Sequence, residues 1–285
     1  MVTDACWIDY DQDGDKDLVL AGEWMKVRVL MNNKGMFSDM TSRSGLDETS
    51  GWWNCIYPAD IDLDGDIDLI AGNLGLNSIL KASPGEPVEM YLNDFDDNGS
   101  LDHVICSYQD GISYPVASLD ELSGQITGLK KKYASYSDFG GKTAKDIFGS
   151  KALKRSILKR AVLFESCIFV NRGDGTFEIK KLPVEAQFSP VRGILADDID
   201  KDGKTDLLLV GNDYTAKPSM GRYDASYGWC LLGGPASGFS SLMPDESGFK
   251  VQGDARRVLS LKIKGRRYVS AAVNNGDLQI FELLK

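Results

Sequence analysis

Histidine and paired cysteines are what this sequence lacks most clearly, because 285 residues include one His and five Cys. A single His excludes a zinc site built from several imidazole ligands. The cysteines form no C-x-x-C pair, and their odd number and wide spacing argue against a disulfide framework or a zinc ribbon. Each lies in an apolar, strand-like stretch, where a free thiol packs as a small hydrophobic side chain. We therefore predict buried structural thiols, with a pair that meets in space as the alternative, at Cys6, Cys55, Cys106, Cys167 and Cys230.

Long hydrophobic runs are also absent. No stretch approaches the roughly 18 apolar residues of a membrane span, and the N-terminus lacks the basic and apolar regions of a signal peptide. The chain has 42 acidic and 32 basic residues, a net charge of −10, which makes it a poor candidate for nucleic-acid binding. Its apolar content of 42% is enough for a large core and excludes a disordered chain.

What the sequence does contain is an internal repeat. A nine-residue pattern, D-x-[DN]-x-[DN]-G-x-x-D, defines four acidic loops, numbered loop 1 to loop 4, at residues 9–17, 60–68, 94–102 and 198–206. A short strand candidate precedes each loop, and a short apolar run follows it, such as LVLAG after loop 1 and LLLVGN after loop 4. Turn signals such as Asn171-Arg-Gly173-Asp-Gly175-Thr-Phe177 then introduce further strand candidates.

A strand, an acidic loop and further antiparallel strands describe a four-stranded blade, and blades arranged radially make a β-propeller. We therefore predict an all-β fold, a β-propeller of four-stranded antiparallel blades, of which about five are visible as a complete or partial ring. We expect one domain over residues 1–285. The segment 256–284 contains three strand candidates without an acidic loop, which predicts a final blade that lacks a metal site.

Residues 118–165 have a different sequence pattern from the acidic-loop repeats, and this pattern predicts a helical insertion within the third blade. Ser118 and Glu121 have the spacing of a capping box, ahead of a helix that ends near residue 133. A second helix is predicted over 143–148. A third is predicted from Ser150 to about Phe164, because an apolar stripe recurs there at helical spacing.

The acidic loops have the composition of calcium loops. Asp or Asn at positions 1, 3 and 5 places hard oxygen ligands on one side of a tight loop, and Gly at position 6 permits the sharp reversal. Position 12, where an EF-hand needs Glu, is apolar in all four loops, so Asp at position 9 would close the coordination instead. Position 7, which varies, would offer its backbone carbonyl. The predicted ligand residues are Asp9, Asp11, Asp13, Asp15, Asp17, Asp60, Asp62, Asp64, Asp66, Asp68, Asp94, Asp96, Asn98, Ser100, Asp102, Asp198, Asp200, Asp202, Lys204 and Asp206.

The alternative is that these loops are solvated turns, where Asp, Asn and Gly are favoured in any case. Four or five acidic side chains within nine residues would repel one another unless a cation lies among them, which favours metal binding. Calcium suits a loop of many oxygens better than magnesium, which needs rigid octahedral geometry. We therefore expect up to four structural Ca²⁺ ions that tie one strand of a blade to the next.

These residues resemble FG-GAP (VCBS) repeats, and the resemblance covers most of the chain. After residue 110, segments such as FVNRGDGTFEIKKLPVEAQFSPVRGILADDIDKDGKTDLLLVGNDY and GRYDASYGWCLLG are similar to the C-terminal propeller of large Bacteroidota surface proteins grouped with ASPIC/UnbV proteins. The resemblance implies an extracytoplasmic calcium-binding propeller (periplasmic, on the outer-membrane surface or secreted), related in fold to the integrin α-subunit head, without an established catalytic activity. Loop 3 departs from the pattern at Asn98 and Ser100, which implies weaker binding. Such proteins are longer and begin with a signal, so we expect this chain to be a fragment.

The leading functional hypothesis is a non-enzymatic module for binding or assembly at the bacterial surface. The rival is a polysaccharide lyase or hydrolase built on a calcium propeller. The rival would need a carboxylate pair or a Lys/Tyr/Arg cluster away from the calcium loops, and the sequence shows no such constellation. The lone His103 is interpreted as structural.

The segment from Lys130 to Arg160 contains ten basic residues and only two acidic residues, Asp138 and Asp146. They form either a solvated helical surface or a docking patch for an acidic partner, such as a uronic-acid glycan or another protein domain. Five aromatic residues are candidates for a sugar-stacking platform or for ordinary packing: Trp52, Trp53, Tyr223, Tyr227 and Trp229.

Overall fold

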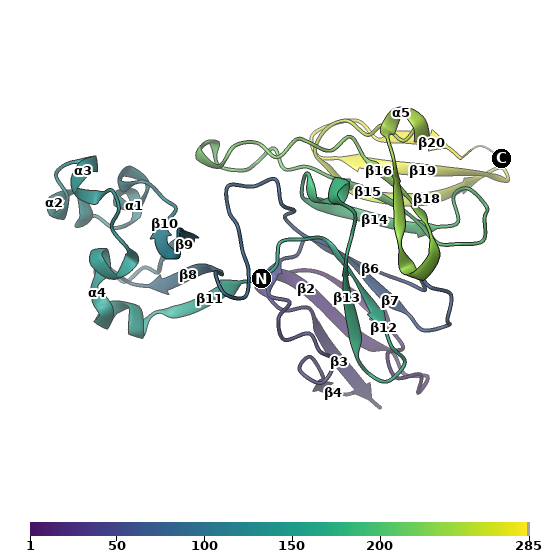
Figure 1. Cartoon of the computed structure of the whole chain (residues 1–285), viewed down its shortest axis with the longest axis horizontal. Helices are drawn as coiled ribbons and strands as arrows, with labels where there is room; N and C mark the ends of the chain where they lie inside the picture. Colours follow the sequence, from purple (N-terminus) through teal and green to yellow (C-terminus); the bar gives the residue numbers. More distant parts are fainter. Residues whose placement is uncertain (284–285) are drawn as a thin grey trace. The chain divides into compact units, whose positions relative to one another are not determined.

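The computed structural model describes residues 1–283 and consists mainly of short antiparallel strands (Figure 1). It divides into two compact units. The main unit comprises Met1–Ile79 and the chain from Phe164 onward, and the inserted unit comprises Leu80–Leu163. The expectation of one domain over residues 1–285 stays a prediction.

The described part of the main unit contains four antiparallel sheets, numbered here in chain order. Sheet 1 has the order β1 (Val2–Ile8), β2 (Asp17–Met25), β3 (Arg28–Asn33), β4 (Met36–Asp39), with β5 (Gly51–Trp52) beside β2. Sheet 2 has the order β6 (Cys55–Ala59), β7 (Asp68–Gly72), β12 (Cys167–Asn171), β13 (Phe177–Lys181). Sheet 3 has the order β14 (Val191–Asp197), β15 (Asp206–Gly211), β16 (Trp229–Gly233), β17 (Phe239–Leu242). Sheet 4 has the order β18 (Ala255–Ile263), β19 (Arg266–Val273), β20 (Gln279–Glu282).

The first strands of these sheets lie next to one another. Strand β6 contacts both β1 and β14, and β14 also contacts β18. This arrangement, with one four-stranded or three-stranded sheet extending from each first strand, confirms the predicted all-β, propeller-like fold. Within residues 1–283 sheets 1 to 4 follow one another as a row through these contacts, and no closed barrel is seen. Arg257 of β18 also reaches Asp4 of β1 at 4.0 Å, so the first strands of sheets 4 and 1 are linked as well.

The core lies between neighbouring sheets, as β15 illustrates. Leu207 and Leu209 belong to a buried cluster shared with sheet 2. Leu208 and Val210 point to the opposite face and belong to a cluster shared with sheet 4. A strand that is buried on both faces has a continuous apolar sequence, which explains the run LLLVG after loop 4.

The inserted unit consists of one further sheet and four short helices, and loop 3 lies between its strands β8 and β9. The helices lie between β10 and β11, so a helical insertion interrupts this sheet as predicted. At the first helix, the Ser118 hydroxyl accepts from Glu121 N at 3.3 Å, and the Glu121 carboxylate accepts from Ser118 N at 2.9 Å. This confirms the capping box. The elements are β10 (Ile112–Pro115), β9 (Asp102–Gln109), β8 (Val88–Asn93) and β11 (Ile157–Ala161) in sheet order, with α1 (Leu119–Gln125), α2 (Leu129–Lys132), α3 (Tyr136–Phe139) and α4 (Ala144–Arg155).

The prediction of a third helix up to about Phe164 is wrong. Helix α4 contains the predicted second helix, passes through a non-helical Gly149 and ends at Arg155. The next residues form β11, in which Ile157 to Ala161 pair with β8 from Leu92 to Val88. Pairing with the open edge of β8 outweighs the helical spacing of the apolar residues, which is only a local preference.

The predicted final blade corresponds to sheet 4, although Leu284 lies outside the described residues. The remaining short elements connect strands and are η1 (Val184–Gln187), η2 (Pro218–Met220), η3 (Pro235–Ser237) and α5 (Pro244–Ser247). Of the helices in residues 1–283, none is both long and apolar enough to cross a membrane.

Candidate metal centres

The four acidic loops share one framework, in which the last Asp holds the loop closed. Asp17, Asp68 and Asp206 are fully buried, and Asp102 is 3% exposed. In each loop, one oxygen of this carboxylate accepts a hydrogen bond from the backbone N–H at position 2, at 2.7–2.9 Å. The ninth residue therefore ties the end of the loop to its beginning.

In the main unit the same carboxylate also reaches the third strand of its sheet. Its second oxygen accepts from the backbone N–H of Asn32 at 2.7 Å, of Asn171 at 2.8 Å and of Gly233 at 2.8 Å in loops 1, 2 and 4. The sequence predicted the turn after Asn171, but it did not predict the hydrogen bond from the Asn171 backbone to the ninth residue of loop 2. Each of these loops is therefore joined to three strands of one sheet.

Glycine at position 6 has a positive φ of 86–97° in all four loops, as the sharp reversal requires. Its N–H donates to the Asp at position 1, at distances from 2.7 to 3.2 Å. Position 4 is also left-handed in every loop, although it holds Gln12, Leu63, Asp97 or Lys201. Sequence reasoning missed this feature because no residue type marks it.

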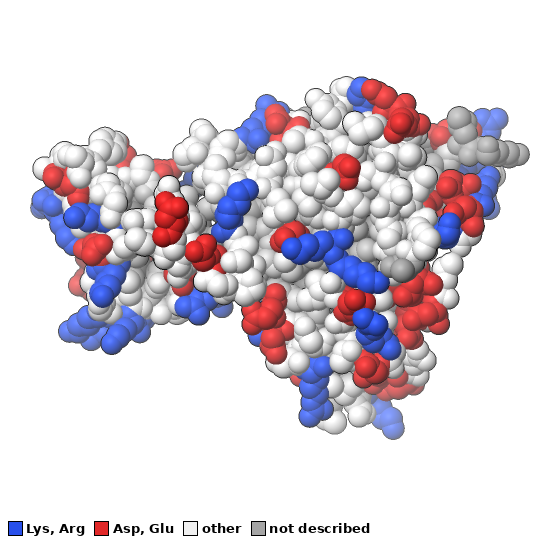
Figure 2. All heavy atoms as spheres, in the orientation of Figure 1, with Lys and Arg blue, Asp and Glu red and all other residues white. Residues whose placement is uncertain are grey.

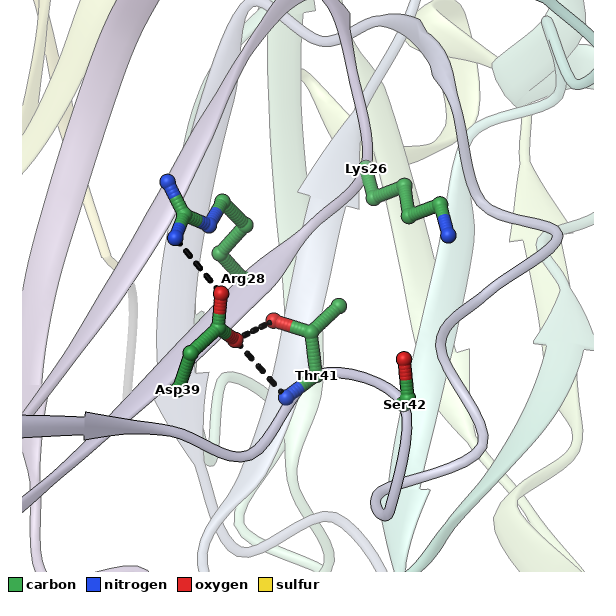
Figure 3. A pocket seen from close by; sticks show the side chains of 5 residues that line it. All are labelled: Lys26, Arg28, Asp39, Thr41 and Ser42. Atoms are coloured by element: carbon green, nitrogen blue, oxygen red, sulfur yellow. Dashed lines mark hydrogen bonds and ion pairs between the residues drawn. The ribbon is translucent and has the colours of Figure 1, made fainter.

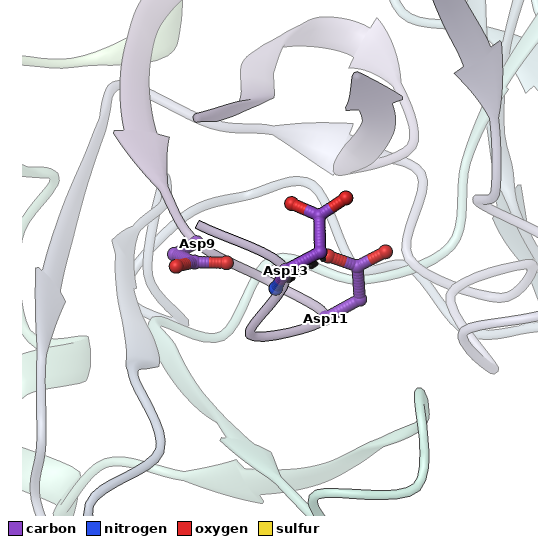
Figure 4. Close-up of side chains that lie close together, drawn as sticks. All are labelled: Asp9, Asp11 and Asp13. Carbon is purple, nitrogen blue, oxygen red and sulfur yellow. Dashed lines mark hydrogen bonds between the residues drawn. The ribbon is translucent and has the colours of Figure 1, made fainter. Parts of the chain in front are cut away.

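In each loop, carboxylates converge on one side. Figure 4 shows the side chains of Asp9, Asp11 and Asp13 gathered around loop 1. Within each group, one oxygen from every residue lies within 4.8 Å of the others. The groups are Asp9, Asp11 and Asp13; Asp60, Asp62 and Asp68; Asp94, Asp96 and Asp102; and Asp198, Asp200 and Asp206.

One buried carboxylate oxygen in each loop has no hydrogen-bond partner among residues 1–283. It is the Oδ1 atom of Asp9, Asp60 and Asp198 at position 1, and of Asp96 at position 3 of loop 3. A buried anionic oxygen without a donor is costly unless a cation neutralises it. The residues therefore fit a hard metal ion, and these clusters could hold one.

The electrostatics of the loops support the same conclusion. Burial raises the pKa of Asp68 to about 6, and the neighbouring carboxylates of Asp62 and Asp64 add to the rise. Burial also raises the pKa values of Asp11, Asp62, Asp102 and Asp206. Protons are thus held more tightly here than in water, and a bound cation would favour the charged forms instead.

The other predicted ligands lie outside these groups. Asp15 accepts from Lys34 N at 3.2 Å, Asp66 accepts from the Gln12 side chain, and Lys204 pairs with Asp202. At position 5 the side-chain oxygen accepts from the N–H of position 7, for example Asp66 N to Asp64 at 2.9 Å. The predicted ligands outside the four groups are Asp15, Asp17, Asp64, Asp66, Asn98, Ser100, Asp202 and Lys204. The ligand role of every predicted residue, inside or outside the groups, stays a prediction.

A shallow pocket of about 390 Å³ lies on sheet 1 and the chain that follows it, lined by Lys26, Arg28, Asp39, Thr41 and Ser42 (Figure 3). Asp39 accepts from the Thr41 hydroxyl at 2.5 Å and from Arg28 at 2.6 Å. These two partners, Thr41 first, lower the pKa of Asp39 to about 2. A carboxylate held this way is a weak base, so this pocket does not favour the lyase or hydrolase alternative.

The five candidate aromatic residues are not gathered on one exposed surface. Trp53 and Trp229 are buried, and Trp52 packs on Trp24 and Phe164 with ring centroids 5.1 and 5.2 Å apart. Tyr227 is 52% exposed. The packing interpretation therefore holds for the three tryptophans.

The cysteines are free thiols, as predicted. Four are buried, and Cys6 is half-buried. Burial raises the pKa of Cys6 and Cys55 to about 12, so neither is a reactive thiolate near neutral pH.

Comparison with known proteins agrees with this architecture. The family model of the FG-GAP-like repeat matches residues 9–71, which contain loops 1 and 2 and the strands from β2 to β7. A search of curated proteins gives no match. Loops 3 and 4 repeat the same geometry outside the matched segment, so the match supports FG-GAP-like repeats as the unit from which this chain is built.

Proposed function

We propose that this chain is a calcium-stabilised, extracytoplasmic module for binding or assembly. The observation that carries the proposal is the recurrence, in four loops, of converging carboxylates with one buried oxygen that lacks a hydrogen-bond donor. The FG-GAP-like repeats support a location outside the cytoplasm, where calcium is plentiful.

Calcium is the metal that these loops suit best. Carboxylates and backbone carbonyls are hard oxygen ligands, and Ca²⁺ accepts six to eight of them in flexible geometry. A bound ion would supply positive charge among the carboxylates. The Asp residues at positions 1 and 3 would hold it together with position 5 or 9, while the bonds of the ninth residue hold the strands in place.

Calcium removal tests this part of the proposal. A ligand at a hundredfold excess over its Kd stabilises the folded state by about 2.7 kcal/mol per site. We therefore expect excess EGTA to lower the thermal midpoint by about 10 °C or more in a chain of this size. Added Mg²⁺, which EGTA binds weakly, should restore little of the loss. An unchanged midpoint in EGTA contradicts the proposal.

The charge on the surface of the inserted unit supports a proposal for the partner. Figure 2 shows Lys and Arg side chains gathered on this unit. Lys130 pairs with Asp120 at 3.4 Å and Arg160 with Glu89 at 3.2 Å, but the other eight make no ion pair within 4.0 Å among residues 1–283. Excess positive charge attracts a polyanion, so we propose an anionic polysaccharide as the partner. The basic surface comprises Lys130, Lys131, Lys132, Lys142, Lys145, Lys151, Lys154, Arg155, Lys159 and Arg160.

A binding titration with a polyuronate tests whether the basic surface binds an anionic polysaccharide. We expect an affinity that falls as salt rises, and a loss of at least about tenfold in the double variant Lys151→Glu/Lys154→Glu. The matched control Lys217→Glu/Lys250→Glu makes the same charge change at exposed sites of the main unit and should bind as the unaltered chain does. Absence of binding, or binding indifferent to salt, contradicts the polysaccharide proposal without affecting the calcium result.

A further inference from the structure

The acidic loops of the main unit contact the sheets that follow them through the residue at position 2. Tyr10 of loop 1 is 5% exposed, and its ring stacks on Phe177 of sheet 2 with the centroids 5.6 Å apart. Ile61 of loop 2 belongs to the buried cluster that includes Leu207 of sheet 3. Ile199 of loop 4 packs against the cluster shared by sheets 3 and 4. Each of these loops therefore takes part in a junction between two sheets.

The residue at position 2 also closes its loop. Its backbone N–H is the donor to the carboxylate at position 9, at 2.7 Å in loop 1 and at 2.8 Å in loops 2 and 4. The carboxylates at positions 1 and 3 lie on either side of it in the chain, and both belong to the converging group. A cation that gathers these carboxylates would therefore fix the backbone of the residue that packs on the next sheet.

Loop 2 receives a hydrogen bond from loop 1 and another from loop 4. The Gln12 side-chain amide of loop 1 donates to the Asp66 carboxylate at position 7. The Thr205 hydroxyl of loop 4 donates to the backbone carbonyl of Asp60, at position 1, at 2.9 Å. Position 1 belongs to the carboxylate group of loop 2, and position 7 is expected to offer a backbone carbonyl to the ion. Two residues expected to hold the loop 2 ion are thus held in place by the neighbouring loops.

We propose that Gln12 and Thr205 are positioning residues for the calcium site of loop 2, and that they make loops 1, 2 and 4 bind calcium cooperatively. This inference rests on the calcium binding proposed above. An ion in loop 1 orders the segment that carries Gln12, and an ion in loop 4 orders the segment that carries Thr205. Loop 2 is then already arranged for binding, so a smaller ordering cost opposes its ion. By thermodynamic linkage, an ion in loop 2 strengthens binding in each neighbour by the same factor.

Loop 3 provides an internal control, because it lies in the inserted unit between β8 and β9. Its residue at position 2, Phe95, packs on Phe148 of α4 with ring centroids 4.2 Å apart. Its residue at position 3, Asp96, accepts from the backbone N–H of Thr127 at 3.0 Å. These contacts all stay within the inserted unit. The loop 3 site should therefore bind calcium independently of the other three.

Calcium titration of the full chain and its loop variants tests the coupling. Asp9→Asn/Asp11→Asn should prevent loop 1 from holding an ion, and Asp94→Asn/Asp96→Asn makes the same change in loop 3. We expect the loop 1 variant to bind three ions, at least one of them about fivefold or more weakly than in the unaltered chain. The loop 3 variant should also bind three ions, with unchanged affinities. Competition with a calcium-binding dye measures the affinities, in about 0.15 M salt to screen the repulsion between bound ions.

Gln12→Leu separates positioning from fold stability. Gln12 is exposed with a φ of 58°, and loop 2 already has a leucine, Leu63, at the equivalent position with a φ of 62°. The substitution therefore removes the amide donor in a conformation that leucine adopts here. We expect it to weaken calcium binding by about threefold or more. The unfolding free energy in EGTA should not change, because an exposed hydrogen bond contributes little to stability.

The variant that combines Gln12→Leu with the loop 1 substitutions shows whether Gln12 transmits the effect. It should bind calcium no more weakly than the loop 1 variant alone. If the loop 1 and loop 3 variants change the remaining affinities equally, or leave them all unchanged, the coupling is overturned while calcium binding itself stands. If the unaltered chain binds no calcium, the proposed function fails and the coupling fails with it.

Discussion

At the scale of single residues, the ninth position of the acidic loops has a role that is separate from metal binding. Asp68 is fully buried and accepts backbone N–H bonds from Ile61 at 2.8 Å and from Asn171 at 2.8 Å. These two donors lie on either side of the inserted unit in the sequence. The carboxylate therefore holds together parts of sheet 2 that the chain itself separates.

The variant Asp68→Asn tests this role. An amide keeps one acceptor oxygen but turns an N–H₂ group toward the other backbone donor, so one buried N–H loses its partner. We expect a loss of about 1–3 kcal/mol in unfolding free energy, measured by urea denaturation in EGTA so that metal binding does not contribute. Asp64→Asn is the matched control, because Asp64 is exposed and its oxygen can still accept from Asp66 N. If both variants lose the same unfolding free energy, the loss comes from removing one negative charge from the loop. That result would contradict a separate role for the hydrogen bonds of Asp68.

At the scale of elements, the glycine that ends the apolar run after loops 1, 2 and 4 does more than stop a strand. A Cβ at Gly211 would lie 1.7 Å from Pro190 O, and a Cβ at Gly22 would lie 2.0 Å from Met1 O. At Gly72 the distance to Val191 O would be 2.4 Å. The obstacle is backbone in each case and cannot rotate away. These glycines therefore allow two backbones to approach closely.

We expect Gly211→Ala to destabilise the main unit by about 3 kcal/mol or more, because overpacking against rigid backbone forces sheet 3 to shift. Gly85→Ala is the control, since a Cβ there meets nothing within 4 Å. The thermal midpoints of both variants, measured in Ca²⁺, give the comparison. A midpoint for Gly211→Ala equal to that of the control would mean that the β14–β15 pair is not tightly fixed.

The strands that flank the acidic loops could be predicted from the sequence because they are local. Loop, turn and apolar run lie within about 15 residues of one another, and each pair forms as expected, for example β14 with β15. The segment 157–161 was predicted as helix because its partner, β8, lies more than 60 residues earlier in the chain. The sequence of the segment does not show that the edge of β8 is unpaired and can accept another strand.

At the scale of the whole molecule, sheet 2 shows what a pattern search along one chain does not reveal. Its strands β7 and β12 pair directly, although the complete inserted unit lies between them in the sequence. The order of acidic loops predicts consecutive blades, but the sheet that carries loop 3 belongs to the inserted unit, whereas β1, β6, β14 and β18 belong to the main unit. Loop position thus predicts where a sheet begins, whereas membership of the row depends on long-range pairing.

Removal of the inserted unit is therefore the decisive experiment on how the chain is divided. Gly75 N donates to Phe164 O at 2.8 Å, so the chain leaves and re-enters the main unit at neighbouring points that a short Gly-Ser linker can join. We expect a chain in which this linker replaces residues 80–163 to fold, because sheet 2 keeps its own bonds. It should bind three Ca²⁺ where the full chain binds four, and it should lose affinity for polyuronate. Calorimetric titration with each ligand measures both changes. If the shortened chain fails to fold in Ca²⁺, the two units depend on each other for stability, as the single domain expected from the sequence would require.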